Sequence, residues 1–243
     1  MTNVTNVTNV ATAHALDRLP PQAPRTFVIG DLHGEVTLLR RLLVTIQPQP
    51  TDTLVFLGDY VDRGEDSVAT LQELEELRTR TQMIAIRGNH DAAWLEVFTG
   101  TGYRQRPAIP GARAIWDQYR GLPPVSIGRF LETTVLTYED EEAYYSHAGA
   151  RPGLPFWRTP PDELLWGPPG FWHERDAQGR RVEWGKPVIC GHYEVDAPVI
   201  TPIRICLDTA AYRTGVLHAL EVSTHTLVSL RRTGEVDSHR VSW

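Results

Sequence analysis

Short apolar runs alternate with longer amphipathic segments in the first third of the chain. Residues 26–29, 53–57 and 83–86 are mostly apolar and predict buried strands. Residues 35–46 and 67–78 carry leucines at helical spacing and predict helices that each bury one face. The order strand, helix, strand, helix, strand favours neighbouring strands joined by helical crossovers.

The pattern changes in the rest of the chain. Helical patterns over 92–98 and 112–119 are followed by short strand-like runs, which predict a mainly antiparallel second half joined by short turns. These runs are 130–138, 143–145, 187–190, 204–207, 215–222 and 226–231. We therefore predict an α/β fold in which two mixed β-sheets pack together between helices, as a four-layer α/β/β/α sandwich.

Two stretches interrupt this pattern. Residues 1–20 begin with a repeated Thr-Asn-Val triplet and predict a disordered, low-complexity tail without the features of a secretory signal, so residues 21–243 are expected to form one domain. Residues 151–186 are rich in Pro, Gly and Trp and predict an irregular segment. This segment either forms a rim or cap over a site or packs as a separate hydrophobic cluster, and the sequence leaves both open.

Composition narrows the classes of function. The formal net charge of −6 argues against a surface for a nucleic-acid duplex, and no apolar run is long enough to cross a membrane. Cys190 and Cys206 lie in strand-like runs, so we expect no disulfide framework and a cytoplasmic location. Strand alternation turns the side chain of Cys190 away from the loop that follows it, which disfavours a metal-binding role.

Five glycine-containing segments with potential metal ligands each follow a strand-like run. They are residues 30–34, 58–64, 88–91, 146–149 and 191–192. In open α/β sheets, ligands bind beyond the carboxyl ends of the strands, so we expect the five segments to converge on one edge. Together they offer Asp, His and Asn side chains to a single site.

This mixed donor set predicts a site for two divalent metal ions. Carboxylates bind hard cations and imidazole suits first-row transition ions, which favours Mn and leaves Fe, Zn, Ni or Co as alternatives. Two such ions form a clamp for in-line displacement at phosphorus, in which one carboxylate bridges the ions and a bridging hydroxide attacks. The sequence therefore predicts hydrolysis of a phosphate ester.

Three further side chains match the other needs of that reaction. His90 follows Asn89 and is the candidate general acid for the leaving oxygen. Asp62 is the candidate that orients His90 and favours its protonated form. Arg63 can bind phosphate oxygens bidentately.

In order along the chain, these segments resemble the signature blocks of the calcineurin-like metallophosphoesterases. The blocks read Gly-Asp-Leu-His-Gly, Gly-Asp-Tyr-Val-Asp-Arg-Gly, Arg-Gly-Asn-His-Asp, His-Ala-Gly and Gly-His. The resemblance covers residues 27–222 and is greatest to the phosphoprotein-phosphatase branch, in particular to small bacterial serine/threonine phosphatases and diadenosine tetraphosphatases. It implies a β-sandwich flanked by helices.

The resemblance also implies a role for each candidate residue. The metal ligands would be Asp31 and His33 for the first ion, Asp59 for both ions, and Asn89, His147 and His192 for the second ion. His90 would be the general acid, oriented by Asp62. Arg63 and Asn89 would contact the phosphate of the substrate.

Three positions depart from the family pattern. Asp91 stands where many relatives have Glu, and it is not expected to bind metal. Tyr193 follows His192 where Thr is common, which would alter the surroundings of that ligand. Similar bacterial sequences often carry a phosphate-binding Arg near position 167, where this chain has Gly-Pro-Pro. The candidates to replace it are Arg151, Arg175, Arg180 and Arg213.

These features favour a phosphomonoesterase that acts on a phosphorylated protein or peptide, as a phosphoserine or phosphothreonine phosphatase, or on a small phosphoester. A hydrolase of dinucleoside polyphosphates such as diadenosine tetraphosphate is the alternative, because both reactions are attacks on phosphorus. A non-catalytic binding module with the same fold is a third class, and the missing arginine is its only support.

Overall fold

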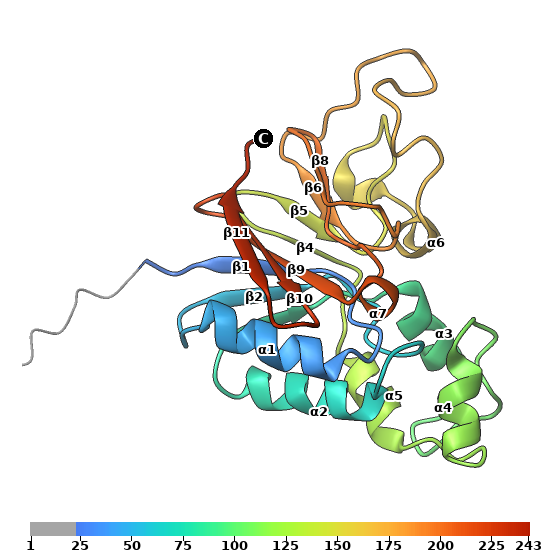
Figure 1. Cartoon of the computed structure of the whole chain (residues 1–243). Helices are drawn as coiled ribbons and strands as arrows, with labels where there is room; N and C mark the ends of the chain where they lie inside the picture. Colours follow the sequence, from blue (N-terminus) through green and yellow to red (C-terminus); the bar gives the residue numbers. More distant parts are fainter. Residues whose placement is uncertain (1–22) are drawn as a thin grey trace, which may run out of the picture.

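Two mixed β-sheets form the centre of the computed structural model, which describes residues 23–243 (Figure 1). The first sheet has the strand order β11 (Val236–Arg240), β10 (Thr226–Arg231), β9 (Val216–Glu221), β1 (Thr26–Ile29), β2 (Thr53–Phe56) and β3 (Gln82–Ala85). The second has the order β4 (Thr137–Glu139), β5 (Tyr144–Ser146), β6 (Val188–Cys190), β8 (Arg204–Cys206) and β7 (Val199–Ile200). The tail predicted over residues 1–20 lies outside the described residues.

The helices lie outside the two sheets or beside them (Figure 1). In chain order they are α1 (Val36–Ile46), α2 (Ser67–Arg78), α3 (Asn89–Val97), α4 (Ala112–Gln118), α5 (Val125–Glu132), the short 3₁₀ helix η1 (Phe156–Arg158), α6 (Pro161–Trp166) and α7 (Ala211–Thr214). Helices α1 and α2 cover the outer face of the first sheet. The predicted arrangement of two mixed sheets flanked by helices is confirmed.

Strand alternation accounts for the layers. In β1, Phe27 and Ile29 point into the cluster beneath α1 and α2, whereas Val28 points into the cluster between the sheets. In β6, Ile189 faces the same inter-sheet cluster, whereas Val188 and Cys190 point outward. Because the central strands are covered on both faces, they carry apolar residues at consecutive positions rather than only at alternate ones.

Parallel pairing brings the ends of the central strands to common edges. Strand β1 pairs in parallel with β2, and β2 pairs in parallel with β3. In the second sheet β5, β6 and β8 are also parallel. The five segments with candidate ligands follow the carboxyl ends of β1, β2, β3, β5 and β6, so the topology itself directs them toward one another.

One strand prediction for the second half is wrong. Residues 130–138 were expected as a strand, but α5 continues to Glu132 and only Thr137–Glu139 form β4. Ile127, Phe130 and Leu131 have helical spacing and are buried against the first sheet's helices, which explains the helix. The mainly antiparallel pairing of the second half is confirmed, since β4, β7, β9, β10 and β11 all pair antiparallel with their neighbours. The connection between β5 and β6 is the long 151–186 segment rather than a short turn, and it allows these two strands to pair in parallel.

The 151–186 segment packs as a hydrophobic layer on the outer face of the second sheet. Phe156, Phe171, Val182 and Trp184 form a buried cluster with strand residues that include Cys190. This packing supports the interpretation of the segment as a hydrophobic cluster, and a rim over the site stays a prediction. The segment thus covers the outer face of the second sheet, where the short helices η1 and α6 are present.

Composition-based expectations also find counterparts in the structure. Cys190 and Cys206 are both buried and free, and they occupy paired positions on the neighbouring strands β6 and β8. The Cys190 side chain faces the outer cluster of the second sheet. Within residues 23–243, every helix is too short or too polar to cross a bilayer.

A buried histidine makes stability depend on pH. His218 on β9 is 6% exposed, and its Nδ1 lies 2.9 Å from Ser229 Oγ on β10. Burial and then the nearby charge of Arg231 lower the pKa of His218 from 6.5 to about 4. Between these two values the unfolded chain binds more protons than the folded protein, so the free energy of unfolding falls as the pH drops through this window.

We expect His218→Asn to reduce this loss. The amide can still bond Ser229 and does not titrate, so the fall in the urea midpoint between pH 7 and pH 5 should be smaller than in the wild type. Chemical unfolding at both pH values measures it. An equal fall in the two proteins would contradict a neutral buried His218.

Candidate active site

The candidate ligands gather where the five loops meet. The first sheet supplies Asp31 and His33 after β1, Asp59 after β2 and Asn89 after β3, and the second sheet supplies His147 after β5 and His192 after β6. The structure thus brings together all six residues that the sequence predicts as ligands. Their roles as ligands stay predictions.

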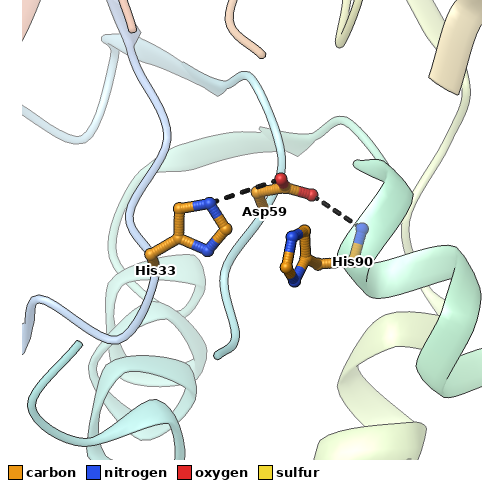
Figure 2. Close-up of side chains that lie close together, drawn as sticks. All are labelled: His33, Asp59 and His90. Atoms are coloured by element: carbon orange, nitrogen blue, oxygen red, sulfur yellow. Dashed lines mark hydrogen bonds and ion pairs between the residues drawn. The ribbon is translucent and has the colours of Figure 1, made fainter. Parts of the chain in front are cut away.

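Asp59 belongs to two groups of potential metal ligands. One donor atom from each of His33, Asp59 and His90 lies within 4.8 Å of the others, and the same holds for Asp31, Asp59 and His147. Figure 2 shows His33 and His90 on either side of Asp59. A carboxylate shared by two donor groups is placed as a bridging ligand would be.

The tautomers of two histidines direct lone pairs into the site. His33 Nδ1 lies 2.8 Å from the Val61 carbonyl oxygen, and His147 Nδ1 lies 2.8 Å from the Leu57 carbonyl oxygen. A carbonyl only accepts, so each Nδ1 donates and each neutral ring keeps its lone pair on Nε2. These Nε2 atoms lie 3.4 Å and 3.6 Å from Asp59 Oδ2.

This donor set fits divalent cations. Asn89 Oδ1 lies 2.9 Å from His147 Nε2 and 3.1 Å from His192 Nδ1. Ligand atoms held about 2.1 Å from one ion are separated from each other by roughly 3.0–3.4 Å. Burial first, and then the charge of a neighbouring histidine, lower the pKa of both His33 and His192 to about 4, so both rings are neutral and able to bind metal near pH 7.

Buried negative charge in the site also favours a bound cation. Burial raises the pKa of Asp31 well above its usual range, and the nearby carboxylates of Asp208 and Asp59 raise it further. The Asp31 carboxylate receives the backbone N–H of His192 at 3.2 Å. A Cβ on Gly191 would lie 1.9 Å from Asp31 Oδ1, so glycine is required there. A divalent cation beside Asp31 and Asp59 would offset their repulsion.

His90 and Asp62 form the pair that the sequence predicts. His90 Nδ1 lies 2.7 Å from Asp62 Oδ2, and Trp94 Nε1 donates to Asp62 Oδ1 at 3.0 Å. Burial lowers the pKa of His90, but the Asp62 hydrogen bond and the Asp59 charge outweigh this and raise it above its usual value. The residue that the sequence does not reveal is Trp94, which is one helical turn beyond His90 on α3 and fixes the Asp62 carboxylate.

Arg63 lies at the rim of the site. Its Nη1 donates to Glu194 Oε1 at 2.5 Å, and its guanidinium lies over the Tyr212 ring at 4.9 Å. The Tyr212 ring in turn makes an edge contact with His33, with ring centroids 5.4 Å apart. Arg63 is therefore connected to the candidate ligand His33 through an aromatic ring, and the Arg63 side chain is 24% exposed.

Asp91 shapes the site although it binds none of the candidate ligand side chains. Its carboxylate accepts the backbone N–H groups of Gly88 and Asp59 at 2.8 Å and of Tyr60 at 3.1 Å. Burial, with the Asp59 charge second, raises the pKa of Asp91 to about 7. The sequence alone does not predict this positioning role. The one feature that points to it is that Asp91 belongs to residues 88–91, the third of the five segments.

Backbone strain is concentrated at these loops. The φ angles are 41° at His33, 51° at Asp59, 71° at Asp62, 69° at Arg63 and 69° at His192. Such left-handed conformations cost a non-glycine residue roughly 1–2 kcal/mol each. The hydrogen bonds around the loops hold them in this conformation, which sets the direction of the site's side chains.

Two departures from the family pattern prove to be linked. A Cβ on Gly167, whose φ is +87°, would lie 2.6 Å from the Tyr193 hydroxyl oxygen. That hydroxyl donates to the Ala148 carbonyl oxygen at 2.9 Å. Tyr193 therefore fills the space that a side chain at position 167 would need.

The chain belongs to the calcineurin-like phosphoesterase family, whose profile matches residues 24–199. It is 41% identical over 137 residues to the symmetrical bis(5'-nucleosyl)-tetraphosphatase of Photorhabdus laumondii, a match that covers 52% of this chain and 45% of that protein. It is 28% identical over 135 residues to the serine/threonine-protein phosphatase PP2A-like PPG1 of Saccharomyces cerevisiae, covering 55% of this chain and 34% of that protein. The chain thus spans less than half the length of these relatives.

Solved structures of low identity share the fold. A metallophosphoesterase from Sphaerobacter thermophilus aligns with a TM-score of 0.53 and 16% identity, covering 91% of this chain and 89% of that one. A cold-active protein-tyrosine phosphatase of a Shewanella species aligns with a TM-score of 0.61 and 16% identity, covering 89% and 80%. Members of the family use a dinuclear divalent-metal site, and the donor set described above provides candidates for one.

We expect Asp91→Asn to weaken metal binding without removing a ligand. The amide NH₂ would face backbone N–H groups, which would loosen the loops of Asp59 and Gly88. Loss of such an orienting group typically lowers metal affinity about 10–100-fold. Titration calorimetry with MnCl₂ measures the change.

Asp117→Asn is the matched control, because Asp117 is exposed on α4 and far along the chain from the site loops. Wild-type affinity in Asp91→Asn would show that the three backbone hydrogen bonds do not position the ligands.

Proposed function

We propose that this protein is a divalent-metal-dependent phosphoesterase that hydrolyses phosphomonoesters. The observation that carries the proposal is the placement of Asp59 in two donor groups directly beside the His90–Asp62 pair. Asp31, His33, Asp59, Asn89, His147 and His192 would hold two ions, of which Mn suits the donors best. When bound, such ions polarise phosphoryl oxygens and acidify water.

The protein's own groups then act on the substrate. Arg63 at the rim and the buried Asn89 can bind phosphate oxygens. His90 donates a proton from Nε2 to the leaving oxygen, since its Nδ1 is bonded to Asp62. Asp62 keeps the ring oriented and favours its protonated form.

The substrate that we infer first is a phosphorylated protein or peptide, or a small phosphoester. Hydrolysis of dinucleoside polyphosphates is the second candidate, and an exposed tryptophan supports it. Trp166 is 56% exposed at the end of α6, and its backbone interacts with the His192 ring. An indole at the rim provides a face on which a base can stack. Diadenosine tetraphosphate and a phosphopeptide assayed side by side would decide between them.

A non-catalytic role has less support, since no predicted ligand or proton donor is missing from the described residues. The cytoplasmic location stays a prediction from the sequence.

Asp59→Asn should abolish turnover of p-nitrophenyl phosphate in the presence of Mn. The change removes one negative charge from the point that both donor groups share. Steady-state assays with metal content measured in parallel test this, with Asp117→Asn as the control. Near wild-type turnover with metal still bound would contradict the proposed chemistry.

His90→Asn should affect substrates unequally. p-Nitrophenolate leaves without protonation, whereas phenolate is more basic and needs a proton. If His90 is the general acid, kcat falls about 10²–10⁴-fold for phenyl phosphate and much less for p-nitrophenyl phosphate. Equal losses for the two esters would mean that His90 acts on something other than the leaving group.

A further inference from the structure

We propose that Arg213 and Arg63, held together by Glu194, form a second anion subsite that binds a phosphate adjacent to the scissile one. The subsite would strengthen the binding of those esters that carry a second phosphate group beside the scissile one. This inference rests on the proposed phosphoesterase function and adds a specificity-determining residue to it.

Glu194 joins the two arginines. Its Oε1 accepts from Arg63 Nη1 at 2.5 Å, and its Oε2 accepts from Arg213 Nη2 at 3.4 Å. The Tyr212 hydroxyl also donates to Oε1, at 3.1 Å. The two guanidinium groups thus contact the two oxygens of one carboxylate. Two positive charges and one negative charge leave the cluster with one net positive charge.

This cluster leads outward from the candidate metal ligands. Tyr212 touches His33 on its inner side and carries the Arg63 guanidinium on its ring. The exposed fraction of the side chain rises from 24% for Arg63 to 32% for Glu194 and 61% for Arg213. A phosphate bound by Arg63 in the site would therefore have its neighbour in the direction of Arg213. Successive phosphates of one chain are close enough for both contacts.

The backbone holds this arrangement before any substrate binds. The buried Asp208 carboxylate accepts the backbone N–H of Glu194 at 3.0 Å and that of Ala210 at 2.8 Å. Glu194 and Ala210 both have left-handed φ angles, of 44° and 54°. Asp208 thus ties the loop of Glu194 to the start of α7, which carries Tyr212 and Arg213. Preorganised donors bind an anion with little ordering cost.

The other candidates for an extra phosphate ligand have partners elsewhere. Arg151 pairs with Glu163, Arg180 pairs with Asp176, and Arg175 Nη1 donates to the Gly179 carbonyl oxygen. Of the four arginines that the sequence left open, Arg213 is the one bonded to a partner of Arg63.

Arg213→Ala tests the subsite. A charge-assisted, two-pronged contact is worth about tenfold or more in affinity. We expect the dissociation constant for inorganic tripolyphosphate, measured by calorimetry on the Mn-loaded protein, to rise about tenfold relative to that for orthophosphate. The ratio of kcat/KM for diadenosine tetraphosphate to that for p-nitrophenyl phosphate should fall by a similar factor. Arg213→Lys keeps the charge but not the fork, and should fall between the wild type and Arg213→Ala.

Arg175→Ala is the matched control, an arginine bonded to a loop carbonyl away from this cluster, and it should leave both ratios unchanged. Unchanged ratios in Arg213→Ala, with the thermal midpoint retained, would overturn the subsite while leaving the phosphoesterase proposal intact. If the wild type turns over neither ester, the phosphoesterase proposal fails, and the tripolyphosphate titration still decides whether the subsite exists.

Discussion

The site depends most on the hydrogen bonds that the Asp91 carboxylate accepts. This carboxylate binds backbone N–H groups from the loops after β2 and β3, and so holds Asp59 and Asn89 at a fixed separation. Parallel strand pairing brings these loops near each other, but it does not fix the conformation of the turns that carry the candidate ligands. The buried carboxylate fixes that conformation. It does so at the cost of additional negative charge close to Asp59, which a cation in the site would offset.

The sequence predicted the central strands, α1 and α2 because burial on one or both faces leaves a regular apolar pattern. It predicted the candidate ligands because they are concentrated in five short segments that follow strands. It failed for α5, where Phe130 and Leu131 suit a strand as well as a helix and only their packing partners decide. It also missed Asp91, Trp94 and Glu194, because their contacts join distant positions. Glu194 and Arg63, for instance, are 131 residues apart.

The departures from the family pattern become understandable when the contacts are known. Gly167 and Tyr193 are far apart in the chain, yet the hydroxyl of one occupies the place of a side chain on the other. Glu194, the residue after Tyr193, forms ion pairs with both Arg63 and Arg213. The residue found at one position of the site is therefore explained by its contact with a residue at another position. A comparison with the family pattern at single positions does not reveal such contacts.

The first sheet carries Asp31, Asp59 and Asn89, and the second carries His147 and His192. Neither sheet therefore contains a complete set of donors, and the site exists only once the two have docked. A chain cut within residues 151–186 would leave His192 in the second fragment and the other five candidate ligands in the first, and each fragment would hold strands of both sheets. Recovery of metal binding on mixing the two fragments would therefore report that they have reassembled into the complete fold.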